Sequence, residues 1–183
     1  INDQDDVSMP TRIEKQVRFL LANGKIDVVG CNCIEFNDSI ERTVITTVEA
    51  NVANSASPAR NPSLMFRKIV LARHGMWKWQ CEYAADFEWL YRWYALGVTF
   101  FILPEPLIRY RYAHGGNVSS SRTLNQAAKL AAFRTYFGFR LIGTVGPRWW
   151  ATTLFSYYRV TTLSLRWLAK RAVSIVRGSK LGR

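Results

Sequence analysis

Three aspartates lie within the first six residues of the chain, Asp3, Asp5 and Asp6, although the chain as a whole is strongly basic. Asp3 and Asp5 are two residues apart, so on a loop that follows a strand both carboxylates can face one ion. Oxygen ligands of this kind suit Mg²⁺ or Mn²⁺, which keep water and phosphate oxygens in their remaining positions. The alternative is that these charges only complement the dipole of a helix that starts near Pro10.

Two arginines near the middle of the chain are candidates for binding phosphate. Arg109 and Arg111 belong to the segment 106–112, which alternates like a strand with one polar face. Residues two apart on a strand share a face, so both guanidinium groups could bind the same group of phosphate oxygens. Exposed charges on a strand edge would show the same pattern. The sequence leaves both interpretations open.

The segments that must position these side chains alternate between strands and helices. The pattern predicts helices over 12–24, 82–97 and 123–137, strands over 26–36, 42–49, 63–68, 98–104 and 106–112, and a loop over 51–62. Such alternation is typical of an α/β sheet with antiparallel additions. Functional loops of these sheets follow the carboxyl ends of strands. The aspartates should therefore follow a strand, but only Ile1 and Asn2 precede them in the chain. We therefore expect the chain to begin in the middle of a fold.

The first predicted helix has recognisable ends. Thr11 and Glu14 have the spacing of a capping box, and Gly24 is expected to end the helix in a left-handed conformation. The apolar residues of this helix share one face: Ile13, Val17, Leu20 and Leu21.

Several cysteines and tryptophans fit structural roles. Cys31, Cys33 and Cys81 show no zinc-site spacing, so we expect reduced and mostly buried thiols in a reducing compartment. Trp89 and Trp93 are four residues apart on the helix predicted over 82–97. This spacing favours a stripe of core residues over a sugar-stacking surface.

The charge of the chain is divided unevenly. All 13 acidic residues lie at or before Glu105, whereas residues 106–183 contain 14 basic residues and no acidic one. We therefore expect two parts, 1–122 and a basic, aromatic helical extension over 123–183. A helix from Pro147 with aromatic and basic sides resembles helices that lie on anionic membrane surfaces. Packing on the rest of the chain is the alternative. No nucleic-acid motif is present, so no nucleic-acid partner is expected, and neither a signal peptide nor a spanning helix is expected.

Five segments resemble, in order, the motifs of family 2 glycosyltransferases, nucleotide-sugar enzymes with the Rossmann-like GT-A fold. They are DQDDVSMPTRIEKQ (3–16), IDVVGCNCIEF (26–36), NPSLMFRK (61–68), AADFEWLYRWYALG (84–97) and PLIRYRYAHGGNVSSS (106–121). Each motif is weak alone, but five in family order are a stronger signal. The resemblance covers roughly residues 2–122. The family's nucleoside-binding N-terminal half has no counterpart, so 1–122 resembles the C-terminal part of a GT-A domain.

The resemblance implies inverting transfer of a sugar from a nucleotide-diphosphate donor. Asp3 and Asp5 match the family's D-x-D motif, so Asp5 would bind the metal most directly and Asp3 would hold the ribose or the metal's surroundings. Asp86 matches the general base, although the Glu that precedes it in the family is Ala85 here. His114 matches a histidine near the diphosphate and metal, but its spacing is one residue longer than usual, so a surface turn histidine is the alternative.

Acceptor binding is implied for three further residues. Trp77 and Trp79 precede the implied base and could line an acceptor groove or anchor their loop in the core. Asn61 stands where the family often has His and could bind a sugar hydroxyl. Asp6 would orient the loop or the sugar, or would serve only as a helix-start charge.

The resemblance and the basic extension together predict a cytoplasmic enzyme, peripheral to the inner face of the plasma membrane. It would build cell-surface polysaccharide on a glycan or lipid-linked acceptor. One alternative is an inactive glycosyltransferase fragment that acts as a membrane-surface binding module. The other is a nucleic-acid-binding protein driven by the charge of residues 106–183.

Overall fold

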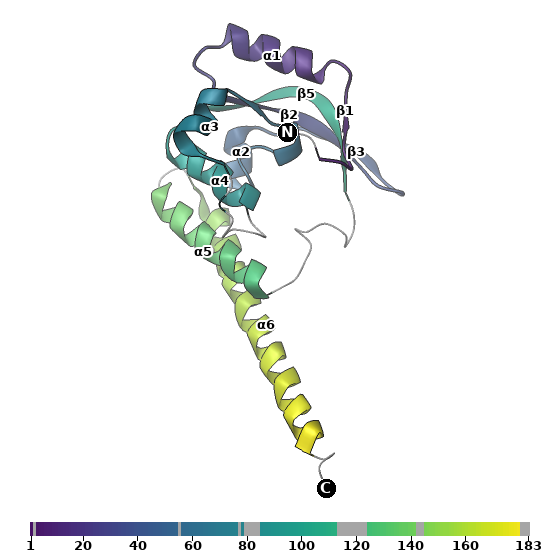
Figure 1. Cartoon of the computed structure of the whole chain (residues 1–183), viewed down its shortest axis with the longest axis vertical. Coiled ribbons are helices and arrows are strands. Elements are labelled where there is room, and N and C mark those ends of the chain that lie inside the picture. Colours follow the sequence, from purple (N-terminus) through teal and green to yellow (C-terminus); the bar gives the residue numbers. More distant parts are fainter. Residues whose placement is uncertain are drawn as a thin grey trace.

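The computed structural model describes residues 1, 3–54, 56–76, 78, 85–112, 124–141 and 145–179, with backbone alone at 124–127, 163, 166, 167 and 169–179. The fold is mixed α/β (Figure 1). Its strands are β1 (Val7–Ser8), β2 (Val28–Phe36), β3 (Glu41–Val44), β4 (Met65–Phe66) and β5 (Phe100–Arg111). The α-helices of the described residues are α1 (Arg12–Ala22), α2 (Val48–Ala53), α3 (Lys68–His74), α4 (Ala85–Ala95), α5 (Leu124–Arg140) and α6 (Pro147–Ser179), and η1 (Asn61–Ser63) is a short 3₁₀ helix.

One mixed sheet organises the first part of the chain. Its two long strands, β2 and β5, run parallel to each other. β1 pairs antiparallel with β5, while β3 and β4 pair antiparallel with β2. Residues 28–33 of β2 are all buried, as expected for a strand that is covered on both faces. The prediction of an α/β sheet with antiparallel additions is confirmed.

β5 is a single strand, whereas the sequence predicts two strands separated near Pro104. Cys31 of β2 pairs with Leu103, but the next residue, Asn32, pairs with Pro106. Pro104 and Glu105 therefore form a bulge opposite one step of β2. Pro104 lacks an N–H and cannot donate to the ladder, so an unpaired position suits it. Pairing resumes beyond the bulge and carries β5 on to Arg111.

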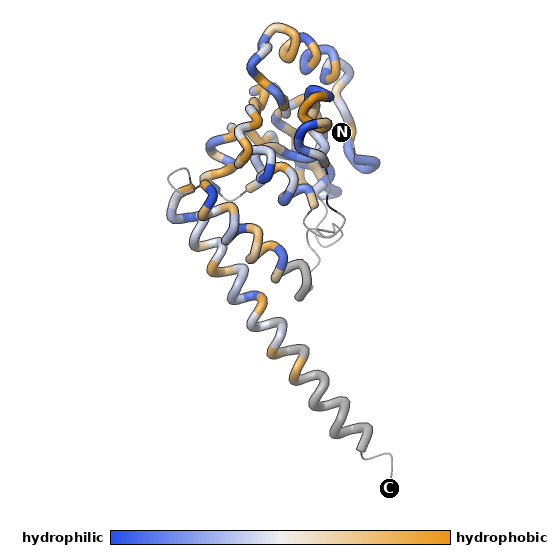
Figure 2. The backbone as a smooth tube through the Cα atoms, turned by 60° about the vertical axis from the view of Figure 1, so that its left-hand side comes forward, coloured by the Kyte–Doolittle hydropathy of each residue, from blue (hydrophilic) through white to orange (hydrophobic). Residues whose placement is uncertain are grey.

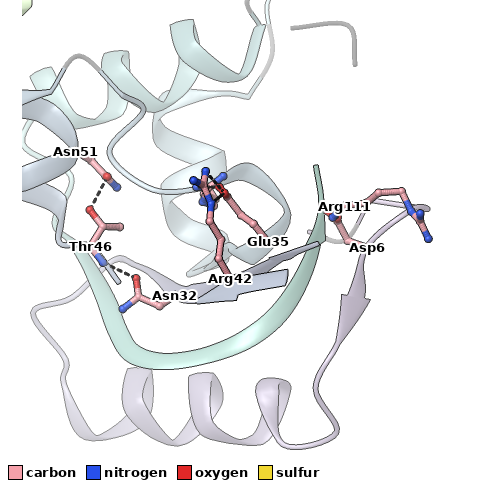
Figure 3. A network of polar contacts seen from close by, with 8 residues as sticks. Asp6, Asn32, Glu35, Arg42, Thr46, Asn51 and Arg111 are labelled. Carbon is pink, nitrogen blue, oxygen red and sulfur yellow. Dashed lines mark hydrogen bonds and ion pairs between the residues drawn. The ribbon is translucent and has the colours of Figure 1, made fainter. Parts of the chain in front are cut away.

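The predicted strand over 42–49 is also wrong in its second half, because β3 ends at Val44 and α2 follows. The Thr46 N–H donates to Asn32 Oδ1 at 2.9 Å, and the Thr46 hydroxyl donates to Asn51 Oδ1 at 2.7 Å (Figure 3). These bonds turn the chain out of the sheet. The Thr47 hydroxyl then accepts the Ala50 N–H and caps α2, so the predicted loop over 51–62 begins as a helix.

The predicted strand over 63–68 is reduced to β4, since its ends are recruited by neighbouring helices. Ser63 closes η1, and Lys68 opens α3. The strand over 26–36 and the helix over 82–97 are confirmed in type, and Gly97 follows α4 with a φ of 82°.

Helix α1 is correctly predicted, but its apolar face is not the buried one. Ile13, Val17 and Leu21 are 53%, 41% and 77% exposed. The buried residues are Arg12, Gln16 and Leu20.

Hydrogen bonds explain this orientation. Arg12 Nη1 donates to the Pro62 carbonyl at 2.6 Å, and Gln16 Nε2 donates to the Ser63 carbonyl at 2.7 Å. These two side chains satisfy carbonyl groups of η1, and the bonds set which face of α1 is turned toward the rest of the chain. The capping box and the left-handed Gly24 are wrong: Thr11 makes no side-chain cap, and Asn23 ends the helix through its N–H to the Phe19 carbonyl.

The core confirms the structural interpretation of the tryptophan pair on α4. Trp89 and Trp93 are fully buried with Val28, Leu64 and Leu90. Their rings meet edge to face at 4.4 Å between centroids.

The predicted burial of the cysteines is confirmed for the two described thiols, while Cys81 lies outside the described residues and the reducing compartment stays a prediction. Cys31 and Cys33 are buried and free. Burial raises the pKa of Cys31 from 9.0 to about 11, because a thiolate would lose its hydration there.

The raised pKa of Cys31 predicts a loss of stability in alkali. Between about pH 9 and 11 the unfolded chain releases this proton while the folded chain keeps it, so the free energy of unfolding falls by about 2–3 kcal/mol. Urea denaturation at pH 8 and pH 11 should show a smaller alkaline loss in Cys31→Ala than in the wild type. Equal losses in both proteins would contradict this assignment.

The α5–α6 hairpin packs against the sheet domain at its base and then leaves it. Trp149 is fully buried, contacts the rings of Phe87 and Tyr91, and donates its Nε1–H to the Arg134 carbonyl at 2.9 Å. A Cβ at Gly138 would come within 2.6 Å of Trp149 Nε1, so this glycine permits the helices to approach. Beyond this contact α6 extends away from the sheet (Figures 1 and 2). Among the described residues, no helix combines the length and apolar character needed to cross a membrane.

Candidate functional site

The aspartate loop, residues 3–6, is held against the end of β5. Val7 and Ser8, which follow the loop, pair with Arg109 and Ile108. Asp6 Oδ1 accepts the backbone N–H of Arg111 at 2.8 Å. The loop is therefore fixed by a strand pairing and by a side-chain anchor, and both join it to a segment that lies far away in the sequence.

Asp6 is the most buried carboxylate of the loop, with 8% of its surface exposed. Its second oxygen, Oδ2, is buried and has no hydrogen-bond partner among the described residues. Burial raises the pKa of Asp6, the Arg111 N–H opposes this shift, and the negative charges of Asp5 and Asp3 add to it. An unpartnered buried carboxylate oxygen beside two further carboxylates is an arrangement that a cation would stabilise.

Asp3 links the loop to a distant part of the sequence. Its pKa is raised first by burial, then by the charge of Asp5, and then by the charge of Asp86. Asp86 is exposed and is the second residue of α4, and its Oδ1 accepts the N–H of Phe87 at 2.8 Å. Asp86 therefore lies near enough to Asp3 for its charge to raise the pKa of Asp3.

A buried ion-pair group lies close to the aspartate loop. Glu35 is 5% exposed, and its two oxygens accept from Arg42 Nε at 2.8 Å and from Arg60 Nη2 at 2.5 Å. Figure 3 shows Arg42 reaching Glu35 over β2. The Arg60 guanidinium also lies 5.0 Å from the centroid of the Tyr110 ring and lowers the pKa of Asp6.

Arg60 therefore brings positive charge to the side of the carboxylates. Sequence reasoning did not select it, because it lies in the predicted loop 51–62. Its position directly before Asn61 is the signal that could have drawn attention to it.

Arg109 and Arg111 both pack on Phe36. Each guanidinium lies 4.7 Å from the Phe36 ring centroid, and Arg109 also pairs with Glu41 at 2.7 Å. Figure 3 shows the Arg111 side chain directed away from Glu35 and Arg42. The contact of Arg111 with the aspartate loop is made by its backbone, and phosphate binding by the two side chains stays a prediction.

The remaining candidates are only partly described. Asn61 opens η1, and its Oδ1 is buried without a hydrogen-bond partner among the described residues. Trp77, Trp79 and His114 lie outside the described residues. Within the part of the chain that the structure describes, no three His, Cys, Asp or Glu side chains form a ready-made metal site. A magnesium-type ion does not require one, since it commonly takes one or two carboxylates together with substrate phosphates and water.

Comparison of the chain with protein-family models and with curated proteins gave no match. Its function is therefore inferred from its own residues.

Proposed function

We propose that this chain carries the metal and general-base side of a glycosyltransferase site with the GT-A fold. The reaction would be inverting transfer of a sugar from a nucleotide diphosphate to a membrane-associated glycan or lipid-linked acceptor in cell-surface polysaccharide synthesis. The main support is that the charge of Asp86 acts on Asp3 and raises its pKa, because a donor-binding carboxylate and a base must face the same sugar. The mixed sheet with its parallel β2–β5 pair is compatible with such a fold.

The aspartate loop would hold Mg²⁺ or Mn²⁺ together with the donor's diphosphate. Asp5 and Asp3 would be the ligands, and the unpartnered Oδ2 of Asp6 adds negative charge to the same place. When bound, the ion supplies Lewis-acid stabilisation of the charge that develops on the leaving diphosphate. Anchoring of Asp6 on the Arg111 N–H keeps the loop in position before any ligand binds.

Asp86 would accept the proton of the acceptor hydroxyl as that oxygen attacks the anomeric carbon. Its exposure at the start of α4 leaves it open to an acceptor. Attack from the side opposite the diphosphate inverts the anomeric configuration. Trp77, Trp79 and Asn61 would bind the acceptor, whereas Arg109, Arg111 and His114 would lie toward the donor.

The metal role of the loop can be measured without assaying sugar transfer. Mn²⁺ together with a nucleoside diphosphate should raise the melting temperature of the intact protein at pH 7, because only the folded chain presents the site. The shift should disappear with EDTA and shrink strongly in Asp5→Asn. Asp38→Asn, in an exposed turn, is the matched control and should retain it. Equal shifts in both variants would remove Asp5 from the metal site.

A membrane-binding module without activity is a second candidate, and the surface of α6 favours it. Leu154, Phe155, Tyr158 and Leu165 are 70%, 60%, 63% and 65% exposed. They lie in the part of the chain that has no acidic residue. Bulky apolar and basic groups on one helix are typical of binding to the surface of an anionic bilayer.

Vesicle flotation tests membrane binding directly. The chain should float with vesicles that contain anionic lipid and stay behind with purely zwitterionic ones, because the positive charge supplies part of the binding energy. A Leu154→Ser, Tyr158→Ser variant should float less, since it removes exposed apolar area and leaves the charge unchanged. Tight, salt-dependent binding to RNA without flotation would instead favour the nucleic-acid alternative.

A further inference from the structure

A groove of about 420 Å³ lies between α4 and α5 and is lined by residues of both helices. It lies on a different face of α4 from Asp86. Glu88, Arg92 and Leu96 recur at one-turn spacing along the groove, whereas Asp86 precedes Arg92 by six residues, which is far from a whole number of turns. The volume is in the range of small-molecule sites. The proposed sugar-transfer site makes no use of this groove, which we call the α4–α5 groove.

The groove contains three basic side chains and a single carboxylate. Glu88 is 4% exposed and pairs with Arg92 at 2.8 Å and with Lys78 at 3.7 Å. Arg92 also donates to the carbonyls of His74 and Met76, so its guanidinium is engaged by protein groups. Glu88 pairs closely with Arg92 and more loosely with Lys78, so the one carboxylate offsets only part of the positive charge, and Lys78 and Arg140 present the remainder to a ligand.

The rest of the groove is apolar. Phe133 and Phe137 line it from α5, and Leu96 and Tyr136, which are 52% and 57% exposed, extend it to the surface. Two basic groups beside an apolar surface suit a molecule with an anionic head group and a hydrocarbon chain. A free inorganic anion would leave the apolar part unused.

We propose that the α4–α5 groove binds the phosphate head of an anionic membrane lipid. The phosphate contacts Lys78 and Arg140, and the first carbons of the lipid chains lie over Leu96 and Tyr136. The neighbouring surface argues for a lipid source: Phe139, one turn along α5 from Tyr136, is 65% exposed, and no acidic residue follows Glu105 in the chain.

The groove would therefore select one lipid molecule, whereas α6 would bind the bilayer surface as a whole. This inference rests on the membrane-surface part of the proposed function, and it is independent of sugar transfer.

The groove can be tested with lipid that forms no bilayer. Monomeric dihexanoyl phosphatidylglycerol, titrated into the full chain by calorimetry, should bind saturably with one molecule per chain. Dihexanoyl phosphatidylcholine has the same chains and phosphate but no net charge and should bind about tenfold more weakly, as should inorganic phosphate. Equal affinity for either competitor would overturn the assignment to an anionic lipid.

A matched pair of variants separates the groove from general charge. Ala132→Trp places an indole in the groove and changes no charge, whereas Ala128→Trp adds the same group to an exposed site one turn earlier on α5, outside the groove. With melting temperatures as the check on folding, the first variant should lose at least about tenfold in affinity and the second should match the wild type. Wild-type affinity in Ala132→Trp would contradict binding of the lipid in the α4–α5 groove.

Vesicle flotation then distinguishes the two proposals. Ala132→Trp should still float with anionic vesicles, because α6 is unchanged. Saturable binding of the short-chain lipid by a chain that does not float would support the groove and reject the membrane-surface role of α6.

Discussion

Replacing Asp86 with asparagine is expected to lower kcat for sugar transfer by about 10²–10⁴-fold, the usual contribution of a positioned general base. Asparagine keeps the size and polarity of the side chain but cannot accept the acceptor's proton. Binding of Mn²⁺ and a nucleoside diphosphate should stay within about twofold of wild type, since Asp86 is assigned to the acceptor and not to the donor. The measurement is steady-state transfer by the intact protein, with donor affinity determined separately.

Two comparisons make the Asp86 result decisive. Asp38→Asn removes a carboxylate from an exposed turn and should leave kcat unchanged. Asp3→Asn should weaken metal-dependent donor binding, because Asp3 is a metal ligand in the proposed site. Full activity of Asp86→Asn would show that the base is another group.

Trp93→Ala is expected to lower the free energy of unfolding by about 3–5 kcal/mol, the range for removing a large aromatic side chain from a core. Trp93 is fully buried, its ring contacts Trp89 and Phe66, and its Nε1–H donates to the Gly75 carbonyl at 2.8 Å. Chemical denaturation monitored by circular dichroism gives the value directly.

Trp93→Phe separates packing from hydrogen bonding at this position. It keeps an aromatic ring but leaves the Gly75 carbonyl without its donor, so the loss should be smaller, about 1–3 kcal/mol. Trp150→Ala serves as the comparison at a partly buried tryptophan of α6 and should also lose less than Trp93→Ala. A loss below about 1 kcal/mol in Trp93→Ala would contradict the core role and reopen a ligand-binding role for this side chain.

Segments whose residues strongly favour one type of secondary structure were predictable from the sequence. β2 opens with the apolar and small residues of 28–31, and such a run, with β-branched and apolar neighbours, favours a buried strand. The burial of Trp89 and Trp93 followed from their spacing on a helix. The α1 face was not predictable, because Arg12 and Gln16 are buried by carbonyl groups of η1 that come from a distant segment.

The candidate site likewise has features that the sequence predicts and features that it does not. The cluster of carboxylates is visible in the sequence, but which of them is buried is not. The sequence predicts that Asp6 orients the loop or the sugar, or serves only as a helix-start charge, whereas the structure makes it the most buried member because the Arg111 N–H at the end of β5 binds it. Arg60 gave no pattern in sequence, since its role depends on Glu35 and Tyr110, which lie on other elements.

The sequence by itself determined the types of the main elements, the uneven distribution of charge and the presence of an acidic cluster, because these depend on composition and short-range spacing. The tertiary structure decided which charged groups come near one another: Asp86 acts on Asp3, Arg60 pairs with Glu35, and the basic side chains of the α4–α5 groove line one pocket. These arrangements depend on the pairing of β5 with β1 and β2 and on the packing of α5 beside α4. Local preferences in a chain carry little information about contacts that join residues so far apart.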